Sequence, residues 1–157
     1  MNNFQILTVI GLLVLLLIIA WCDQRTMTIP NGLVLACMIP AVLAVFAFPE
    51  MTMSSRLIGI VSVSLPLLLI TILVPGAFGG GDIKLMAVLG FFLGWKNCLI
   101  AFAIAVLAGG LYGLVFLVLK KKSGKAHFAF GPFLCAGTIV TMFAGEQLLS
   151  WFRFALF

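Results

Sequence analysis

Two aspartates are the residues of this chain best placed to do chemistry. The chain has only four acidic residues, and Asp82 follows three glycines, Gly79-Gly80-Gly81, at the start of a hydrophobic segment. A second aspartate, Asp23, stands at the end of the first hydrophobic segment. A carboxylate at membrane depth is costly and is seldom kept there without a use. Two carboxylates that share a site can divide the roles of acid and base, which is the chemistry of aspartyl proteases.

Each aspartate also has a purely structural interpretation. Asp23 could mark only a helix end at the lipid headgroups, and Asp82 could be only an N-cap that accepts a backbone N–H. A capping aspartate does not need three preceding glycines, which let a backbone turn tightly and approach another segment closely. The glycines therefore favour a function for Asp82, whereas Asp23 taken alone fits the structural interpretation better. Together the two carboxylates could form a catalytic pair. One would deprotonate a water and the other, protonated, would polarise a scissile carbonyl, which requires no metal or organic cofactor.

Helix ends suggest which aspartate holds the proton. Asp82 should lie at a helix N-terminus, which favours negative charge, and Asp23 at a helix C-terminus, which disfavours it. Two carboxylates within a few ångströms of each other do not both ionise easily, so the pair would share one proton. The hypothesis is that Asp82 is the more anionic partner.

The elements that position these residues must be membrane helices. Of the 157 residues, 64% are hydrophobic and 8% are charged, with a mean hydropathy of +1.34. The apolar runs are continuous rather than alternating, which favours helices over a β-barrel. We predict an all-α polytopic membrane bundle of about six transmembrane helices, forming one domain over residues 1–157. The expected segments are 4–22, 33–48, 57–74, 83–95, 98–119 and a sixth that starts near Phe128 and fades between Ala144 and Leu149.

The fourth segment is short for a membrane span. Its 13 residues make about 20 Å of helix, against a hydrocarbon core of about 30 Å. Either this helix is strongly tilted or the glycine run before it dips into the membrane. The second arrangement would place Asp82 in a wet cavity lined by protein, where irregular backbone is tolerated.

Basic residues predict the orientation in the membrane. The side that holds loops one, three and five should be cytoplasmic, which places both aspartates there and both termini outside an inner (cell) membrane. The net charge of +5 follows from this asymmetry, so we expect anionic lipid rather than nucleic acid as a partner. The cytoplasmic set is Arg25, Lys84, Lys120, Lys121, Lys122 and Lys125, and the outer set is Arg56, Lys96 and Arg153.

The four cysteines, Cys22, Cys37, Cys98 and Cys135, are scattered through apolar segments and form no C-x-x-C pair. With a single histidine in the chain, they do not predict a zinc site. Buried thiols are the expected state.

The motifs around the aspartates resemble those of the type IV prepilin peptidase family. They are Asp23 followed by Ile29-Pro30-Asn31, then Gly79-Gly80-Gly81-Asp82-Ile83-Lys84-Leu85, and then Phe130-Gly131-Pro132-Phe133. The resemblance covers nearly the whole chain, whereas presenilin-type proteases share only the G-x-G-D pattern. It implies that Asp23 and Asp82 are catalytic, with Gly79, Gly80, Gly81, Lys84, Pro30, Asn31, Gly131 and Pro132 as supporting residues.

The resemblance also implies a substrate and a reaction. Such enzymes remove the short basic leader of prepilins at the cytoplasmic membrane face, before a hydrophobic stretch. Longer members carry an additional domain with paired cysteines, which is associated with N-methylation. Because this sequence lacks such a domain and C-x-x-C pairs, we predict that methyltransferase activity is absent. The short form resembles the branch that serves Flp-type pili, and pseudopilin or archaellin substrates stay open.

Several alternatives remain at this stage. A small proton-coupled transporter or channel could use the same acidic pair, and a membrane scaffold could use the aspartates only as caps. Lys84 could hold a substrate charge or the Asp82 carboxylate, or could reach the cytoplasmic surface as a snorkelling lysine. His127 could relay protons or be solvated. The residues do not determine the oligomeric state.

Overall fold

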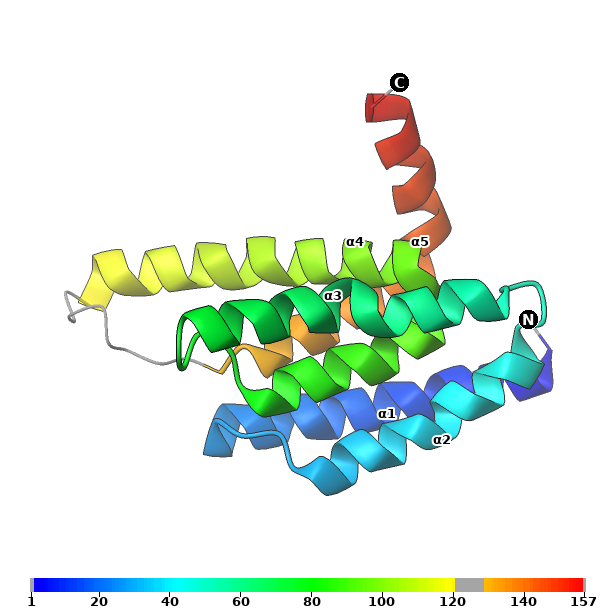
Figure 1. The fold of residues 1–157 in the computed structure, drawn as a ribbon, viewed down its shortest axis with the longest axis horizontal. Helices are drawn as coiled ribbons and strands as arrows, with labels where there is room; N and C mark the ends of the chain where they lie inside the picture. The colour runs from blue at the N-terminus through cyan, green and yellow to red at the C-terminus, as the bar shows by residue number, and fades with distance from the viewer. Residues whose placement is uncertain (1, 121–128, 157) are drawn as a thin grey trace.

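The computed structural model describes residues 2–120 and 129–156, and every regular element in these ranges is a helix. Figure 1 shows the helices packed as a bundle. Four of them are long and apolar enough to cross a membrane, and the shorter α2 is also apolar. The predicted all-α membrane bundle is therefore confirmed. The helices are α1 (Asn3–Thr26), α2 (Asn31–Ala47), α3 (Met53–Leu73), α4 (Gly80–Lys120) and α5 (Gly131–Leu156).

The helix α4 consists of two helical parts joined at Gly94. This glycine has φ 74° and ψ 166°, a backbone conformation that is not helical and that favours glycine. Figure 1 shows the chain turning back at this point, so that the two parts of α4 run in opposite directions. The first part, residues 80–93, is about 21 Å long. The two parts correspond to the fourth and fifth predicted segments, which gives six helical segments in the described chain.

Two helix boundaries differ from the prediction. Gly80 and Gly81 belong to the first turn of α4, so two of the three glycines are helical rather than part of an irregular loop. The helix α5 continues to Leu156, beyond the point at which hydropathy fades, because helix formation does not require a lipid-soluble sequence. Figure 1 shows the last turns of α5 pointing away from the bundle. The expected start near Phe128 lies outside the described residues.

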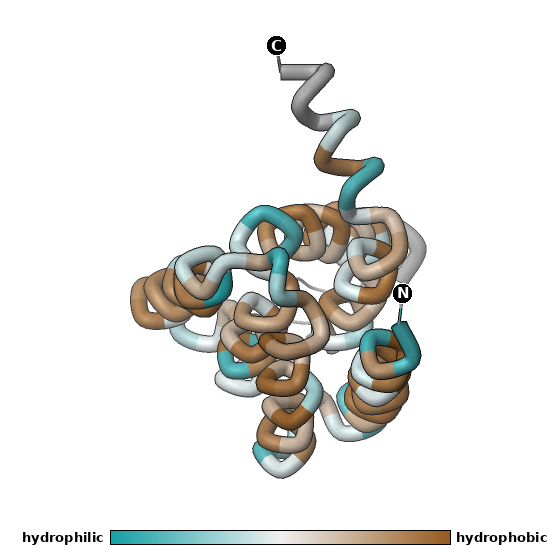
Figure 2. The backbone as a smooth tube through the Cα atoms, turned by 90° about the vertical axis from the view of Figure 1, so that its right-hand side faces the viewer, coloured by the Kyte–Doolittle hydropathy of each residue, from teal (hydrophilic) through white to brown (hydrophobic). Residues whose placement is uncertain are grey.

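The outside of the bundle is apolar. Large hydrophobic side chains are exposed on several helices, among them Phe46 at 73%, Leu73 at 80% and Leu107 at 74%. Figure 2, in which the bundle is seen end-on, shows hydrophobic residues along its helices. An exterior of this kind is stable in lipid rather than in water, as expected of an integral membrane protein.

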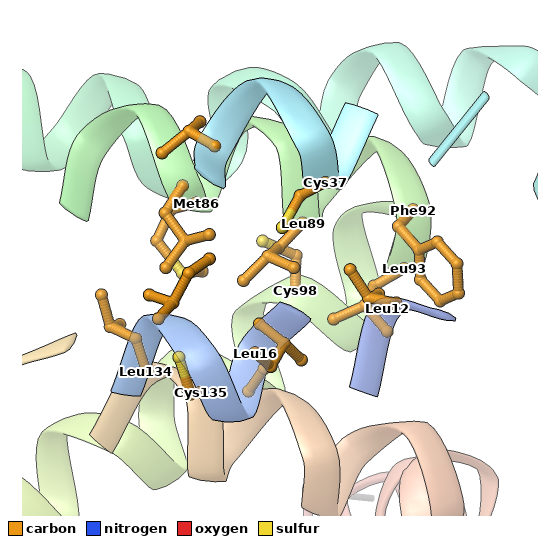
Figure 3. Close-up of a cluster of buried hydrophobic side chains, with 14 of the residues drawn as sticks. Leu12, Leu16, Cys37, Met86, Leu89, Phe92, Leu93, Cys98, Leu134 and Cys135 are labelled. Atoms are coloured by element: carbon orange, nitrogen blue, oxygen red, sulfur yellow. The ribbon is translucent and has the colours of Figure 1, made fainter. Parts of the chain in front are cut away.

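The interior is filled by aliphatic side chains and cysteines. Leu12 and Leu16 of α1 are fully buried and lie between the first part of α4 and α5 (Figure 3). Cys37, Cys98 and Cys135 are buried free thiols in the same core, as predicted, whereas Cys22 is partly exposed.

Glycines allow two pairs of helices to approach closely. A Cβ atom on Gly59 of α3 would overlap the carbonyl oxygen of Gly90 in α4, and a Cβ on Gly90 would overlap that of Gly59. A Cβ on Gly137 of α5 would likewise overlap the carbonyl oxygen of Ala101. Small residues at such contacts let backbones meet, which is how membrane helices gain packing energy.

Arg56 is buried rather than exposed in a loop. Its side chain is 1% exposed, and Nη2 donates hydrogen bonds to the carbonyls of Ala44 (2.8 Å) and Phe48 (3.0 Å) at the end of α2. Its Nη1 donates to the carbonyls of Phe91 (3.2 Å) and Phe92 (3.4 Å), just before Gly94. The guanidinium thus satisfies carbonyls at two helix ends.

The two ends of the bundle carry different features. The α1–α2 connection and the starts of α4 and α5 lie at one end, whereas the N-terminus, the α2–α3 connection and the turn at Gly94 lie at the other (Figure 1). Asp23, near the end of α1, and Asp82, near the start of α4, therefore lie at the same end. We call it the aspartate end.

Candidate active site

Asp23 lies in the last turn of α1 and is only 4% exposed. The helix ends at Met27, whose φ of 52° is left-handed and whose N–H donates to the Asp23 carbonyl (2.8 Å). The Asp23 carboxylate faces the bundle, where Oδ2 accepts a hydrogen bond from the N–H of Gly131 (2.9 Å). The Asp23 side chain is therefore packed inside the bundle rather than exposed at the helix end.

Asp82 is the third residue of α4 and is 8% exposed. Its Oδ2 accepts a hydrogen bond from the N–H of Gly79 (3.2 Å), the residue immediately before the helix. A side chain at this position that reaches back to the N-cap N–H is half of a capping box. The capping role proposed for Asp82 is thus present, although Asp82 caps from inside the helix and is buried at the same time.

The fold brings these two carboxylates together from segments 59 residues apart in the sequence. The residues next to their two N–H donors, Phe78 beside Gly79 and Phe130 beside Gly131, are in ring contact, with centroids 5.6 Å apart. Each hydrogen bond described above engages only one carboxylate oxygen. The result is a buried pair of carboxylates, each oriented by one backbone N–H.

Both aspartates lie next to the N-terminus of a helix. Asp23 lies not only at the C-terminal end of α1 but also against the first N–H of α5, from Gly131. Asp82 lies in the first turn of α4. Both carboxylates therefore face a helix N-terminus, and helix ends no longer distinguish which of them holds the proton.

Three of the supporting glycines have close neighbours. A Cβ atom on Gly131 would lie 2.5 Å from Asp23 Oδ2, and one on Gly81 would lie 2.8 Å from the Cβ of Ile29. A Cβ on Gly79 would lie 3.2 Å from Asp82 Oδ2. Gly131 thus makes room for one carboxylate, and Gly81 lets α4 approach the α1–α2 connection.

Gly80 differs from these three, because a Cβ atom there meets nothing within 4 Å. The structure gives no packing reason for this glycine.

Lys84 contacts neither aspartate. Its Nζ donates a hydrogen bond to Oδ1 of Asn31 (3.0 Å), and the side chain is exposed. This bond joins the first turn of α2, whose N-cap residue is Pro30, to the second turn of α4. Pro132 is the second residue of α5, where its missing N–H removes no helical hydrogen bond. Gly131 and Pro132 thus form the start of α5.

The other two acidic residues of the chain are not at this site. Glu50 and Glu146 line a cavity of about 610 Å³ together with Asn97, Thr141 and Phe92, at the end of the bundle opposite the aspartates. A second cavity of about 320 Å³ between α2, α3 and α4 has an apolar lining that includes Met38 and Phe91. Neither includes Asp23 or Asp82. His127 and the loop of residues 121–125 lie outside the described residues.

Phe78 and Phe130 were missed as candidates. Each directly precedes a glycine whose N–H binds an aspartate, Gly79 and Gly131 respectively. Their rings contact each other edge-on, with centroids 5.6 Å apart. The repeated Phe-Gly pair before two helices was the sequence signal that could have identified them.

The fold and the site together define the class: an apolar, all-helical membrane bundle with two buried carboxylates at one end. The family model described as "Type IV leader peptidase family" matches residues 10–114, a range that includes both aspartates. The chain belongs to this family, and the resemblance that its motifs indicated is confirmed.

Several curated relatives are named "Prepilin leader peptidase/N-methyltransferase". The one from Bacillus subtilis (strain 168) is 33% identical over 138 residues, which is 88% of this chain and 56% of that protein. The one from Legionella pneumophila is 38% identical over 74 residues, 47% of this chain and 26% of that protein. The chain thus spans about half of the first relative and about a quarter of the second. No solved structure matches.

Proposed function

We propose that this protein is a membrane-embedded aspartyl endopeptidase that removes the leader peptide from type IV prepilin-like precursors. The observation that carries this proposal is the buried pair of Asp23 and Asp82, each oriented by a backbone N–H. Family membership supports a prepilin peptidase. Flp-type prepilins are the first substrates to test, and pseudopilins and archaellins are the others.

The proposed mechanism uses both carboxylates and one water. The ionised aspartate takes a proton from the water, whose oxygen attacks the scissile carbonyl carbon, while the protonated aspartate gives its proton to the carbonyl oxygen. When the tetrahedral intermediate collapses, the C–N bond breaks, the leaving amine takes a proton from the carboxyl that received it from water, and a hydroxyl of the intermediate returns its proton to the other carboxylate. The two aspartates thus exchange roles during the reaction, and the mechanism needs no cofactor.

The aspartate end is proposed to face the cytoplasm, with both termini outside. Arg25 and Lys84 lie at this end of the bundle, and the positive-inside rule assigns basic ends to the cytoplasm. Arg56 is buried and donates hydrogen bonds to backbone carbonyls, so it is not an outer loop charge. Its removal from the outer set increases the excess of basic residues on the proposed cytoplasmic side. A membrane substrate would reach the pair from the lipid, with its basic leader at the cytoplasmic surface.

The test is cleavage of a candidate Flp-type prepilin co-expressed with the wild-type protein, read as a size shift with the new N-terminus determined by mass spectrometry. The expected result is one cut between the leader and the hydrophobic segment. The same spectrum tests the prediction that methyltransferase activity is absent, because N-methylation adds a fixed mass. If no prepilin, pseudopilin or archaellin is cut, a proton-flux assay on the same membranes tests the transporter alternative.

A further inference from the structure

The two aspartates are oriented by two chain segments of the same design. In each, a phenylalanine precedes a glycine whose N–H donates to a carboxylate: Phe78-Gly79 serves Asp82, and Phe130-Gly131 serves Asp23. Adjacent residues share a planar peptide unit, so a displacement of either phenylalanine also displaces the N–H donor that follows it.

The two phenylalanines contact each other across the site. Their ring centroids are 5.6 Å apart with an interplanar angle of 62°, which is the edge-to-face arrangement that aromatic pairs prefer. The segments that carry them lie 52 residues apart in the sequence. This contact therefore links the donor of one carboxylate to the donor of the other. We call the pair Phe78 and Phe130 the aromatic clasp.

Burial shows that the clasp fixes the α3–α4 connection. Of residues 74–79, only Phe78 is partly buried, and its neighbours are all exposed. Phe78 also packs against the core of the bundle. The position of Gly79 thus depends on where the Phe78 side chain is held.

Phe130 is seated on the second part of α4. A Cβ atom on Gly109 would lie 2.9 Å from the Phe130 ring, whereas a Cβ on the adjacent Gly110 meets nothing within 4 Å. The missing side chain at Gly109 therefore provides the space that the Phe130 ring occupies. Gly109 and Gly110 form a matched pair, because both are helical glycines of α4 and only the first touches the clasp.

We propose that Phe78 and Phe130 are positioning residues that set the spacing of the two carboxylates by coupling their N–H donors. The catalytic consequence rests on the proposed function, whereas the coupling itself does not. An edge-to-face aromatic contact is worth about a 2- to 13-fold change in an equilibrium constant. This is the size of the coupling that the clasp should show.

The first experiment measures the coupling without reference to activity. Amide hydrogen exchange of Gly79 and Gly131 is followed by NMR in full-length protein labelled with ¹⁵N-glycine. Phe78→Leu is expected to accelerate exchange at Gly131, and Phe130→Leu at Gly79, each by at least about 2-fold. If each substitution affects only the glycine beside it, the clasp proposal is overturned, whether or not the protein cuts prepilins.

The second experiment measures the consequence for cleavage. Phe78→Leu and Phe130→Leu should each lower kcat with little change in KM, and the double variant should lose less than the product of the two single losses. The control is the pair Phe48 and Phe92, which has similar ring geometry at the other end of the bundle, at 6.3 Å and 72°. The same double-mutant cycle on this control pair should alter thermal stability but leave kcat within about 2-fold.

The glycine pair gives an independent perturbation that keeps both rings. Gly109→Ala should lower kcat because the added methyl displaces the Phe130 ring, whereas Gly110→Ala should not. Equal effects of the two substitutions, or multiplicative losses in the clasp cycle, would exclude a positioning role. If the wild-type protein cuts no precursor, the proposed function fails, and the exchange experiment alone decides on the clasp.

Discussion

Gly131→Ala is the substitution that acts most directly on one carboxylate without removing it. The added Cβ would lie 2.5 Å from Oδ2, 2.9 Å from Cγ and 3.2 Å from Cβ of Asp23. All three neighbours belong to the same side chain, so relief of the overlap requires the Asp23 carboxylate to move by about 0.5 Å or more. That movement also disturbs the hydrogen bond from the Gly131 N–H (2.9 Å).

The expected effect is on kcat rather than on folding. A displacement near 1 Å of a catalytic group costs about 100-fold in rate, which is about 2.7 kcal/mol of transition-state free energy. We therefore expect Gly131→Ala to lower kcat by about 10- to 100-fold. The melting temperature should change little, since alanine is a better helix former than glycine.

The assay is cleavage of a purified prepilin by purified protein in detergent or nanodiscs, with kcat and KM determined separately. Gly32→Ala is the matched control, because Gly32 lies in the first turn of α2 and a Cβ there meets nothing within 4 Å. It should keep the wild-type kcat. A Gly131→Ala protein that is folded and cuts at the wild-type rate would refute the placement of Asp23 against α5.

Other predictions concern the supporting residues. Gly81→Ala should lower kcat at least about 10-fold by pushing α4 away from the α1–α2 connection, whereas Gly80→Ala should leave kcat near the wild-type value. A cleavage assay in which Gly80→Ala loses more activity than Gly81→Ala would contradict the close contact between Gly81 and Ile29. Lys84→Met and Asn31→Leu should each lower kcat by the same factor, less than about 5-fold, and the double variant should lose no more, because both substitutions break one shared bond. A larger loss of kcat with Lys84→Met alone would favour a contact between Lys84 and substrate. Arg56→Met should lower the free energy of unfolding by about 3 kcal/mol in a denaturation experiment, since it leaves buried carbonyls without partners; unchanged stability would show that these bonds are dispensable.

Much of the fold could be predicted from the sequence because lipid imposes a simple rule on it. Each membrane-spanning segment must satisfy its own backbone hydrogen bonds, so apolar runs become helices. The break in α4 was predicted close to its place, because the gap between the fourth and fifth predicted segments, residues 96–97, lies two residues after Gly94. The extension of α5 to Leu156 was not visible, because hydropathy measures partition into lipid and not helix formation.

The site was predictable in its residue types but not in its contacts. Asp23 and Asp82 stood out because carboxylates are rare in such a chain. The bond from Gly131 to Asp23 joins residues 108 positions apart, and no local pattern encodes a contact at that separation. Arg56 was misjudged as an outer loop charge for a similar reason, since its carbonyl partners in α2 and α4 become neighbours only after the helices pack.

The measurement that tests the central claim most directly is a double-mutant cycle on the two aspartates. Single-turnover cleavage of a purified prepilin is compared for wild type, Asp23→Asn, Asp82→Asn and the double variant, each at equal levels of folded protein. Glu146→Gln, which changes an exposed carboxylate at the opposite end, is the control and should cut normally. Groups that act as one catalytic unit are strongly non-additive, so each single variant should lose about as much rate as the double variant. Substantial cleavage by either single variant, or losses that multiply in the double variant, would contradict the two-carboxylate mechanism.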